Sequence, residues 1–406
     1  MPTGNRTVVE RHVKPSLLIV TTTFPRWEGD DGPAPFVYHH ARAMTEFFEV
    51  TVLAPHFPGA KTSELWEGMR IKRFRYAPKR FEVLADGAGI RGHLRKSFSN
   101  KLSAIALIVA EAWAVLRLQE AHHFINSHWL VPSGLAVSLM VRKKTHVITA
   151  HAADYDLLKK LPGGDSLIRF MARRARAIVC SGARLSAGIT SIVPEARILT
   201  RPMGVETRRF TFCESKRTGH REELRLGKAP VVLFVGKLSA KKGVHVLIRS
   251  VSLLRRQGSA LRLVVAGGGE KAVDLKSLAA KEGIAEEVIF TGPLSNEDIA
   301  GLYSASDVVA VPSIRDISGE TEGMPVVVLE GLSAGRPVVA TDLCSVPAEL
   351  CGKGVIEVKA GDEKSLAEGI EEALAGKAVV EMEAVKKYDV RETARFYYRL
   401  FKGEGM

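Results

Sequence analysis

Cysteine is scarce in this chain of 406 residues. The four cysteines are Cys180, Cys213, Cys344 and Cys351, and no two of them form a Cys-x-x-Cys pair. Structural zinc sites and disulfide frameworks both need cysteines at close, regular spacing. The sequence therefore predicts neither, and we expect the four residues to be buried free thiols.

Long apolar runs are also missing. A membrane span needs roughly 18 consecutive apolar residues, and the nearest candidate, residues 102–118, is interrupted by Ser103, Glu111 and Arg117. We therefore expect an amphipathic or buried helix there. Near the N-terminus, the apolar run at residues 17–20 is too short for the core of a signal peptide. These absences predict a globular protein that stays in the cytoplasm.

Acidic residues are scarce in the first half alone. Residues 1–205 contain 29 Lys and Arg against 16 Asp and Glu, whereas residues 206–406 contain 29 of each. The excess is densest over residues 70–101, with ten basic residues and two acids. Such a surface attracts anions, so we expect it to meet anionic lipid head groups, a lipid-linked phosphate or nucleic acid. A basic surface that only keeps the protein soluble is the alternative.

Aromatic residues are interleaved with the basic ones, which would allow nucleic acid. They are Phe74, Tyr76, Phe81 and Phe98. No recognised nucleic-acid-reading motif accompanies them, so we do not expect a nucleic-acid partner.

Strand-like and helix-like segments alternate along the chain. In the first half we expect strands at residues 16–21, 50–54, 124–128, 145–150 and 177–180. A second series follows at residues 231–235, 261–266, 288–290, 308–311 and 338–340. This alternation is typical of parallel sheets with crossover helices, and domains average about 150 residues. We predict two doubly wound α/β domains facing a cleft, at residues 1–205 and 206–387.

Two carboxylates, Glu322 and Glu330, have seven residues between them in an otherwise apolar segment. A buried carboxylate must have partners or lose its charge, and a ligand rich in hydroxyls would supply them. Pro325 favours a helix start, which leaves the amides of Gly323 and Met324 free at the N-terminus for a sugar or an anion. The alternative is that Glu322 is an acid favoured by the helix dipole at the N-terminus and that Glu330 is a solvated helix residue.

The pattern around these acids resembles the signature of retaining glycosyltransferases of family four. The shared pattern is Glu-Gly-x-Pro-x4-Glu-x4-Gly-x-Pro-Val-Val-Ala, here at residues 322–340. The resemblance implies the GT-B fold, in which two Rossmann-like domains face a cleft and the last helix, here about residues 388–406, packs back on the first domain. It also implies that Glu322 lies by the donor sugar and that Glu330 binds the ribose of the nucleotide.

A basic loop follows the strand expected at residues 231–235. Its Lys237 and Lys242, with the backbone amides before the next helix, would suit an anion, although an ordinary basic turn is the alternative. The loop resembles the Gly-Arg-x4-Lys-Gly loop of the family, which binds the donor diphosphate. Lys237 replaces the usual Arg, which keeps the charge but loses the bidentate geometry. Leu294 lies at the turn where the family stacks the nucleotide base.

His151 follows the strand expected at residues 145–150, at the edge where α/β proteins bind ligands. The run from His151 to Asp154 resembles the His-Gly-x-Asp turn of the family, whose His approaches the reacting sugar, with Ala152 in place of the usual Gly. We therefore place His151 with the donor sugar and Asp154 with the acceptor.

The loop at residues 24–33 lies where the family places a glycine-rich loop for the acceptor and phosphate. The usual adjacent pair of glycines is missing, because Gly29 and Gly32 are separated. We assign Arg26, Asp30 and Gly32 to acceptor contacts.

Together these features predict a retaining glycosyltransferase that moves a sugar from a nucleotide diphosphate sugar to a glycan or lipid-linked hydroxyl acceptor, with an anionic membrane surface as a further partner at the inner face of the cell membrane. The predicted catalytic residues are His151 and Glu322, and the predicted donor-binding residues are Lys237, Lys242, Gly323, Met324, Pro325, Glu330 and Leu294. No Asp-x-Asp motif stands in a suitable loop, so we expect no metal and no cofactor besides the nucleotide sugar. Two alternatives stay open: a non-catalytic protein that binds anionic lipid or RNA, and an inverting transferase or epimerase on the same fold.

Overall fold

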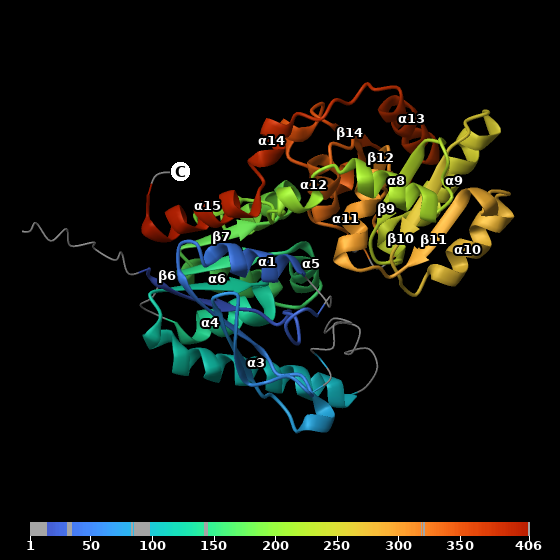
Figure 1. The fold of residues 1–406 in the computed structure, drawn as a ribbon. Helices are drawn as coiled ribbons and strands as arrows, with labels where there is room; N and C mark the ends of the chain where they lie inside the picture. The colour runs from blue at the N-terminus through green and yellow to red at the C-terminus, as the bar shows by residue number, and fades with distance from the viewer. Residues whose placement is uncertain are drawn as a thin grey trace, which may run out of the picture.

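The computed structural model describes residues 14–30, 35–82, 84, 98–141, 145–317, 319 and 321–404. Within these ranges the chain forms two α/β domains, each built on one sheet flanked by helices (Figure 1). The predicted fold class, two doubly wound domains, is confirmed.

The first domain is built on a sheet of eight strands in the order β3-β4-β2-β1-β5-β6-β7-β8. The strands are β1 (Ser16–Val20), β2 (Glu49–Pro55), β3 (Ser63–Trp66), β4 (Met69–Phe74), β5 (Phe124–His128), β6 (Thr145–Ala150), β7 (Ala177–Cys180) and β8 (Ile198–Thr200). Neighbours are parallel except in the β3–β4 hairpin. The strand order reverses between β1 and β5, and ligands bind outside the carboxyl ends of strands at such a reversal.

The second domain is built on a sheet of six parallel strands in the order β11-β10-β9-β12-β13-β14. The strands are β9 (Val231–Val235), β10 (Arg262–Ala266), β11 (Val288–Gly292), β12 (Val308–Val311), β13 (Val338–Thr341) and β14 (Val355–Val358). Here the order reverses between β9 and β12, which are paired directly. The loops that follow these two strands therefore meet at one edge of the sheet, and they carry the predicted donor-binding residues Lys237, Lys242, Gly323, Met324 and Pro325. Of the other two, Glu330 lies in the helix after the second loop and Leu294 follows β11.

Helices connect the strands in both domains. Those of the first domain are α1 (Pro35–Met44), α3 (Phe98–Leu118), α4 (Leu135–Met140), α5 (Ala152–Lys159), α6 (Gly164–Arg174) and α7 (Ala183–Ile192). Those of the second are α8 (Glu214–Glu223), α9 (Val244–Arg256), α10 (Ala272–Lys281), α11 (Asn296–Ala305), α12 (Val326–Ser333), α13 (Glu363–Leu374) and α14 (Met382–Lys386).

The last helix, α15 (Val390–Lys402), returns to the first domain. Its Ala394, Tyr397, Leu400 and Phe401 are buried in the same core cluster as the β1 and β2 side chains. The Tyr397 hydroxyl lies 2.7 Å from Thr149 Oγ1 in β6. The chain thus crosses between the domains twice, and the two crossings are joined where Val205 pairs with Asp389. Figure 1 shows α15 over α1, on the face toward the second domain.

The helix α3 is a long apolar helix of 21 residues. Residues Leu102–Ala121 form a helix that is long and apolar enough to cross a membrane, by length and composition only, and 33% of the apolar window is buried. The inner side of α3 contributes Leu107 and Val115 to the core of the first domain. The predicted amphipathic or buried helix therefore exists here as a helix packed along one side of the first domain.

All four cysteines are free, as expected. Cys180 and Cys344 are buried, whereas Cys213 and Cys351 are only partly covered, so the prediction of burial was right for two of them.

Candidate active site

The first predicted carboxylate stands just before α12. Pro325 is the N-cap of this helix, with φ of −68° and ψ of 130°, so α12 begins one residue later than predicted. The Glu322 side chain is largely buried and meets two ammonium groups. Lys241 Nζ lies 3.1 Å from its Oε1, and Lys242 Nζ lies 3.2 Å from its Oε2. Two residues assigned to one ligand from the sequence, Lys242 and Glu322, thus contact each other.

These ammonium groups decide the charge of Glu322. Burial raises the pKa of the carboxyl, but the two lysines outweigh burial, and the pKa lies below its usual value. Glu322 is therefore ionised at neutral pH. The sequence analysis missed Lys241, whose one available signal was its position beside Lys242 and before Gly243 in a loop that follows a strand.

A glycine fixes the position of this lysine pair. Gly243 follows η5 (Ala240–Lys242) with φ of +67°, and a Cβ on it would lie 1.8 Å from the Pro312 carbonyl oxygen. The Ile314 N–H also donates to the Lys241 carbonyl at 2.8 Å. The loop after β9 and the loop after β12 are thereby packed backbone to backbone, and this contact places the lysines opposite Glu322.

The second predicted carboxylate, Glu330, lies two turns further along α12. Tyr303 in α11 donates its hydroxyl hydrogen to Glu330 Oε2 at 2.6 Å. Burial raises the pKa of Glu330, and the Tyr303 hydroxyl and the positive charge of Arg209 oppose that rise. Tyr303 is a partner that the sequence analysis did not identify, because its contact with Glu330 joins α11 to α12.

Lys237 and Leu294 line one small cavity. Its volume is about 190 Å³, and Val235 and Gly267 also line it. Gly267 has φ of +133°, and a Cβ there would lie 2.0 Å from the Gly236 carbonyl oxygen. Glycine at this position thus lets the turns after β9 and β10 touch, and the cavity opens beside them.

In the first domain, His151 is the N-cap residue of α5 and is 7% exposed. Its ring centroid lies 4.2 Å from that of Trp129 and 5.3 Å from that of Phe36. His151 Nε2 lies 3.5 Å from His128 Nδ1. Burial lowers the pKa of His151 to about 3, with the nearby His40 acting in the same direction. The ring is therefore neutral at physiological pH and offers hydrogen bonds rather than a positive charge.

Asp154 carries a buried carboxylate. It is 5% exposed, and its carboxylate accepts hydrogen bonds from the backbone N–H groups of Leu130 and Tyr155. Burial raises the pKa of Asp154 to about 7, although these N–H groups oppose the rise. The side chain is turned into the protein, where it holds the loop that carries Trp129, and its assignment to the acceptor stays a prediction.

The two halves of the predicted site touch at two glycines. A Cβ on Gly323 would lie 3.0 Å from Ser181 Oγ and 3.7 Å from the Ala152 Cβ. A Cβ on Gly182 would lie 3.6 Å from the Met324 amide nitrogen. The Gly323–Met324 backbone of the second domain therefore lies against the loops that follow β6 and β7 in the first domain, next to His151.

The predicted acceptor loop is closed on itself. Arg26 donates to both carboxylate oxygens of Asp30, at 2.9 and 2.8 Å, and its guanidinium lies 4.6 Å from the Trp27 ring centroid. Arg73 donates to the Pro25 carbonyl at 2.8 Å. These contacts fix the first part of the loop. Gly32, the other residue assigned there, lies outside the described residues.

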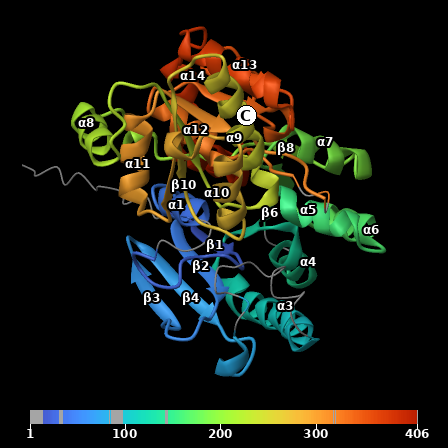
Figure 2. The same cartoon turned by 90° about the vertical axis from the view of Figure 1, so that its right-hand side faces the viewer.

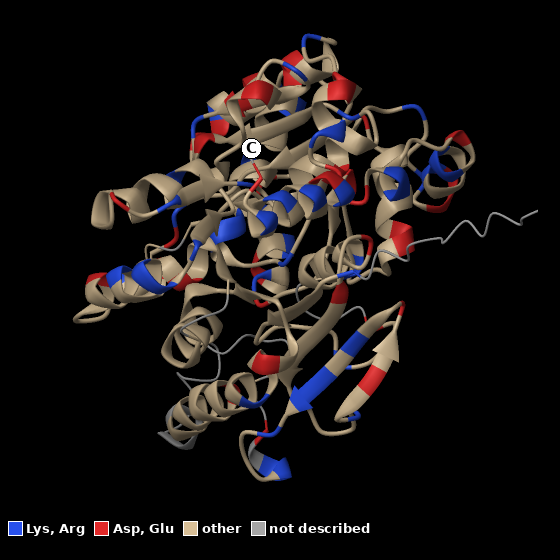
Figure 3. Ribbon diagram, turned by 90° about the vertical axis from the view of Figure 1, so that its left-hand side faces the viewer, with Lys and Arg blue, Asp and Glu red and all other residues tan. Residues whose placement is uncertain are grey.

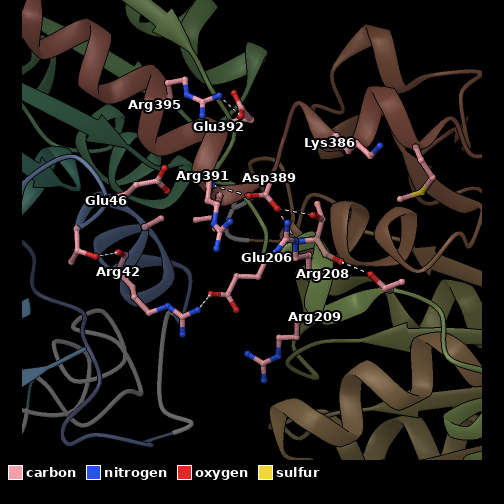
Figure 4. Close-up of a pocket in the computed structure, with 16 residues that line it drawn as sticks. Arg42, Glu46, Glu206, Arg208, Arg209, Lys386, Asp389, Arg391, Glu392 and Arg395 are labelled. Atoms are coloured by element: carbon pink, nitrogen blue, oxygen red, sulfur yellow. Dashed lines mark hydrogen bonds and ion pairs between the residues drawn. The ribbon is translucent and has the colours of Figure 1, made fainter. Parts of the chain in front are cut away.

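A larger pocket of about 840 Å³ lies where the chain crosses between the domains (Figure 4). It is lined by residues of α1, η4 (Thr207–Phe210), α14 and α15, and none of the predicted site residues lines it. Arg42 of α1 pairs there with Glu206 at 2.6 Å. This pocket belongs to the crossing between the domains rather than to the predicted donor site.

Among the residues that the structure describes, no group of three His, Cys, Asp or Glu side chains could hold a metal ion.

Comparison with known proteins finds a family match in the second half of the chain. Residues 215–391 match the family described as Glycosyl transferases group 1. The GDP-mannose-dependent alpha-(1-6)-phosphatidylinositol monomannoside mannosyltransferase of Mycobacterium tuberculosis is 29% identical over 192 residues, 47% of this chain and 48% of that protein. The D-inositol 3-phosphate glycosyltransferase of Actinosynnema mirum is 36% identical over 208 residues, 45% of this chain and 47% of that protein. The chain spans about half the length of the curated relatives it matches.

Solved structures resemble the whole described fold. Sucrose-phosphate synthase from Thermosynechococcus elongatus matches with a TM-score of 0.74 and 16% identity, over 96% of this chain and 100% of that one. Anabaena HepE in complex with UDP matches with a TM-score of 0.68 and 16% identity, over 96% and 100%. At these identities the likeness concerns the fold, which is the GT-B fold.

Proposed function

We propose that the chain is a retaining glycosyltransferase. It would move a sugar from a nucleotide diphosphate sugar to a hydroxyl acceptor. The proposal is supported by the match of residues 215–391 to the Glycosyl transferases group 1 family and by the resemblance seen in the sequence. The observation that carries the proposal is the arrangement at α12, where an ionised carboxylate, two lysines and a helix N-terminus converge.

The donor would bind along the second domain. Its nucleotide base would enter the cavity beside Leu294, and its ribose hydroxyls would bind Glu330, which Tyr303 already holds by a hydrogen bond. The diphosphate would bind Lys237, Lys242 and the backbone amides of the β9 loop. The base remains open, since the relative from Mycobacterium tuberculosis is named for GDP-mannose and Anabaena HepE was solved with UDP.

The sugar would lie between the two domains. Glu322 and the backbone of Gly323, Met324 and Pro325 would bind it from the second domain, and the neutral His151 from the first. In the transfer step the bond between C1 and the phosphate oxygen breaks, and the electron pair leaves with the diphosphate. The acceptor oxygen forms its bond to C1 on the same face, and its proton passes to the departing phosphate. The lysines would stabilise the charge that develops there, and the proposal includes no metal.

The acceptor would approach the first domain. The basic excess of this domain suits a phosphate-bearing or lipid-linked acceptor at an anionic membrane surface, such as the inner face of the cell membrane. The relative from Mycobacterium tuberculosis is named for a phosphatidylinositol acceptor, which supports a lipid-linked hydroxyl here. Arg26 and Asp30 would shape this side through the loop that their ion pair closes.

The test is a thermal-shift panel of UDP-, GDP- and ADP-sugars on the purified protein. We expect one nucleotide class to raise Tm and expect the rise to be lost in Glu330→Ala and Lys242→Ala. Lys281→Ala, an exposed lysine on α10, is the matched control and should behave as the wild type. The anomeric configuration of the product, read by NMR, then separates retention from the inverting alternative.

Two results would count against the proposal. A protein that no nucleotide sugar stabilises, but that binds RNA or anionic lipid, would be the non-catalytic alternative. A product of inverted configuration would leave the donor site in place and remove the retaining mechanism.

A further inference from the structure

The helix α3 presents a line of large apolar side chains to solvent. Leu102, Ile105, Val109, Trp113 and Leu116 are between 41% and 63% exposed. Their spacing of three or four residues puts them on one face of the helix, opposite the face that packs into the first domain. Single exposed apolar residues are ordinary on a protein surface, but a continuous line of five indicates an interaction surface. We call these five residues the α3 stripe.

Basic side chains lie on a segment that packs against the inner side of α3. Arg75, Lys79 and Arg80 are exposed on the segment that runs from β4 into η1 (Lys79–Phe81). Tyr76 and Leu84 of the same stretch are buried in the cluster that also holds the inner side of α3, so this basic segment lies against the helix. Figure 3 shows Lys and Arg along β4 and η1, and Figures 1 and 2 show α3 at the end of the first domain that is far from the second.

The exposed face of the described part of α3 carries no carboxylate. The one acid of the helix, Glu111, is buried, and Ser133 Oγ donates to it at 2.7 Å. On the stripe itself, the Arg117 guanidinium lies 5.0 Å from the ring centroid of Trp113. Trp and Arg both have an apolar body with a polar end, and both are favoured where hydrocarbon meets lipid head groups.

We propose that the α3 stripe docks the protein on an anionic membrane, with the helix lying in the plane of the interface. The apolar line would enter the boundary of the acyl chains, and the basic segment would contact the anionic head groups. Crossing the bilayer is not open to this helix, because its inner face and Glu111 are packed in the domain. A second copy of the chain is disfavoured as the occupant, since a two-fold contact here would bring Arg117 and the basic segment close to their own copies.

The inference rests on the proposed function only for the purpose of docking, which is to hold the cleft near a lipid-linked acceptor. Docking itself is tested on the full chain by co-sedimentation with vesicles of phosphatidylcholine and phosphatidylglycerol in equal amounts, and of phosphatidylcholine alone. The variant is Val109→Gln with Trp113→Gln. The control is Val273→Gln with Val379→Gln, two side chains of the second domain that are 76% and 71% exposed.

We expect the wild type and the control to bind the mixed vesicles, and the stripe variant to bind roughly ten-fold less or weaker still. Binding should fall with added salt and should be weak on phosphatidylcholine alone. Equal binding by the variant, or no binding by the wild type, overturns the proposal. The proposal is also overturned if sedimentation without vesicles shows that the wild type is a dimer and the variant a monomer. The stripe would then bind a second copy of the chain.

Nucleotide binding, measured by thermal shift in the same proteins, separates this inference from the proposed function. The stripe lies away from α12, so the variant should keep the shift and a wild-type Tm. Vesicle binding without any nucleotide-induced shift in the wild type would uphold docking and count against the transferase.

Discussion

Lys242 Nζ lies 3.2 Å from Glu322 Oε2, so the carboxylate proposed to hold the donor sugar is bound by the lysine proposed to hold the donor diphosphate. The two roles compete for one ammonium group. Lys241 Nζ lies 3.1 Å from the other carboxylate oxygen. Lys241 can therefore compensate the charge of Glu322 while Lys242 turns to the phosphates.

This competition predicts opposite effects on binding and turnover in Glu322→Gln. Removal of the negative charge frees Lys242, so the affinity for the nucleoside diphosphate should rise by about five-fold, the size of one partly exposed ion pair. The amide holds the sugar less well, and turnover should fall at least about a hundred-fold. Calorimetric titration with the nucleoside diphosphate measures the affinity, and a transfer assay measures the turnover. Weaker diphosphate binding in the variant would mean that Glu322 orients the lysines instead.

The two lysines should separate in the same assays. Lys242→Met should weaken diphosphate binding at least about ten-fold, because a charge-assisted contact to phosphate is lost. Lys241→Met should change that affinity less than about three-fold and should mainly lower kcat, because Glu322 is left without compensation once Lys242 is engaged. The exposed Lys281→Met is the control. If the two variants lose affinity equally, both lysines bind the diphosphate and the division of roles fails.

Most strands could be predicted because they are buried runs of β-branched residues between turns. The β3–β4 hairpin was missed, although its turn, Glu67–Gly68, has the positive φ pair of +43° and +82° that two-residue hairpins favour. Its strand β4 alternates basic and apolar residues inside a strongly basic stretch, which concealed the pattern. The helix α8 has no buried residue and therefore no apolar period to read. Arg217 and Arg221 fix it instead, through Asp307.

For the candidate site, the sequence could indicate residues that stand in a motif, but not the contacts that the fold makes between separate segments. Glu322, Glu330 and Lys242 stand in recognisable patterns, and the structure brings all three to one edge of the second sheet. The pairing of Lys241 with Glu322 and of Tyr303 with Glu330 joins separate loops and helices, so it depends on the strand order. Asp154 stands at a motif position, yet its side chain points into the protein. A motif position alone therefore does not show that the side chain faces a ligand.

Glu111 predicts a pH dependence of stability. Burial raises its pKa to about 8, opposed by the hydrogen bond from Ser133, whereas the unfolded chain loses that proton near its ordinary value. Between these two values the folded state alone keeps the proton, so this group costs stability progressively as pH rises, and the loss is complete above about 8. Glu111→Gln removes the cost. Relative to wild type, the variant should gain on the order of a few kcal/mol between pH 5 and pH 9.

Urea unfolding at several pH values measures the difference in unfolding free energy between the two proteins. The buried histidines titrate in both proteins, so their contribution cancels in this difference. Glu120→Gln, at the exposed end of the same helical stretch, is the control and should show no such trend. A gap between wild type and Glu111→Gln that stays constant with pH would show that the carboxyl is ionised in the folded state.

Gly243 predicts a link between folding and donor binding. In Gly243→Ala the new Cβ would meet the Pro312 carbonyl oxygen at 1.8 Å, in a backbone with φ of +67°. The loops after β9 and β12 must then separate, which should cost on the order of 3 kcal/mol and should move Lys242 away from the diphosphate. Gly258→Ala is the matched control, because its φ is +94° but nothing lies within 4 Å of the new Cβ. It should cost only about 1 kcal/mol of backbone strain and should leave nucleotide binding unchanged. Equal destabilisation in the two variants, by urea unfolding, would mean that the β9 loop adapts and that the contact with Pro312 does not position the lysines.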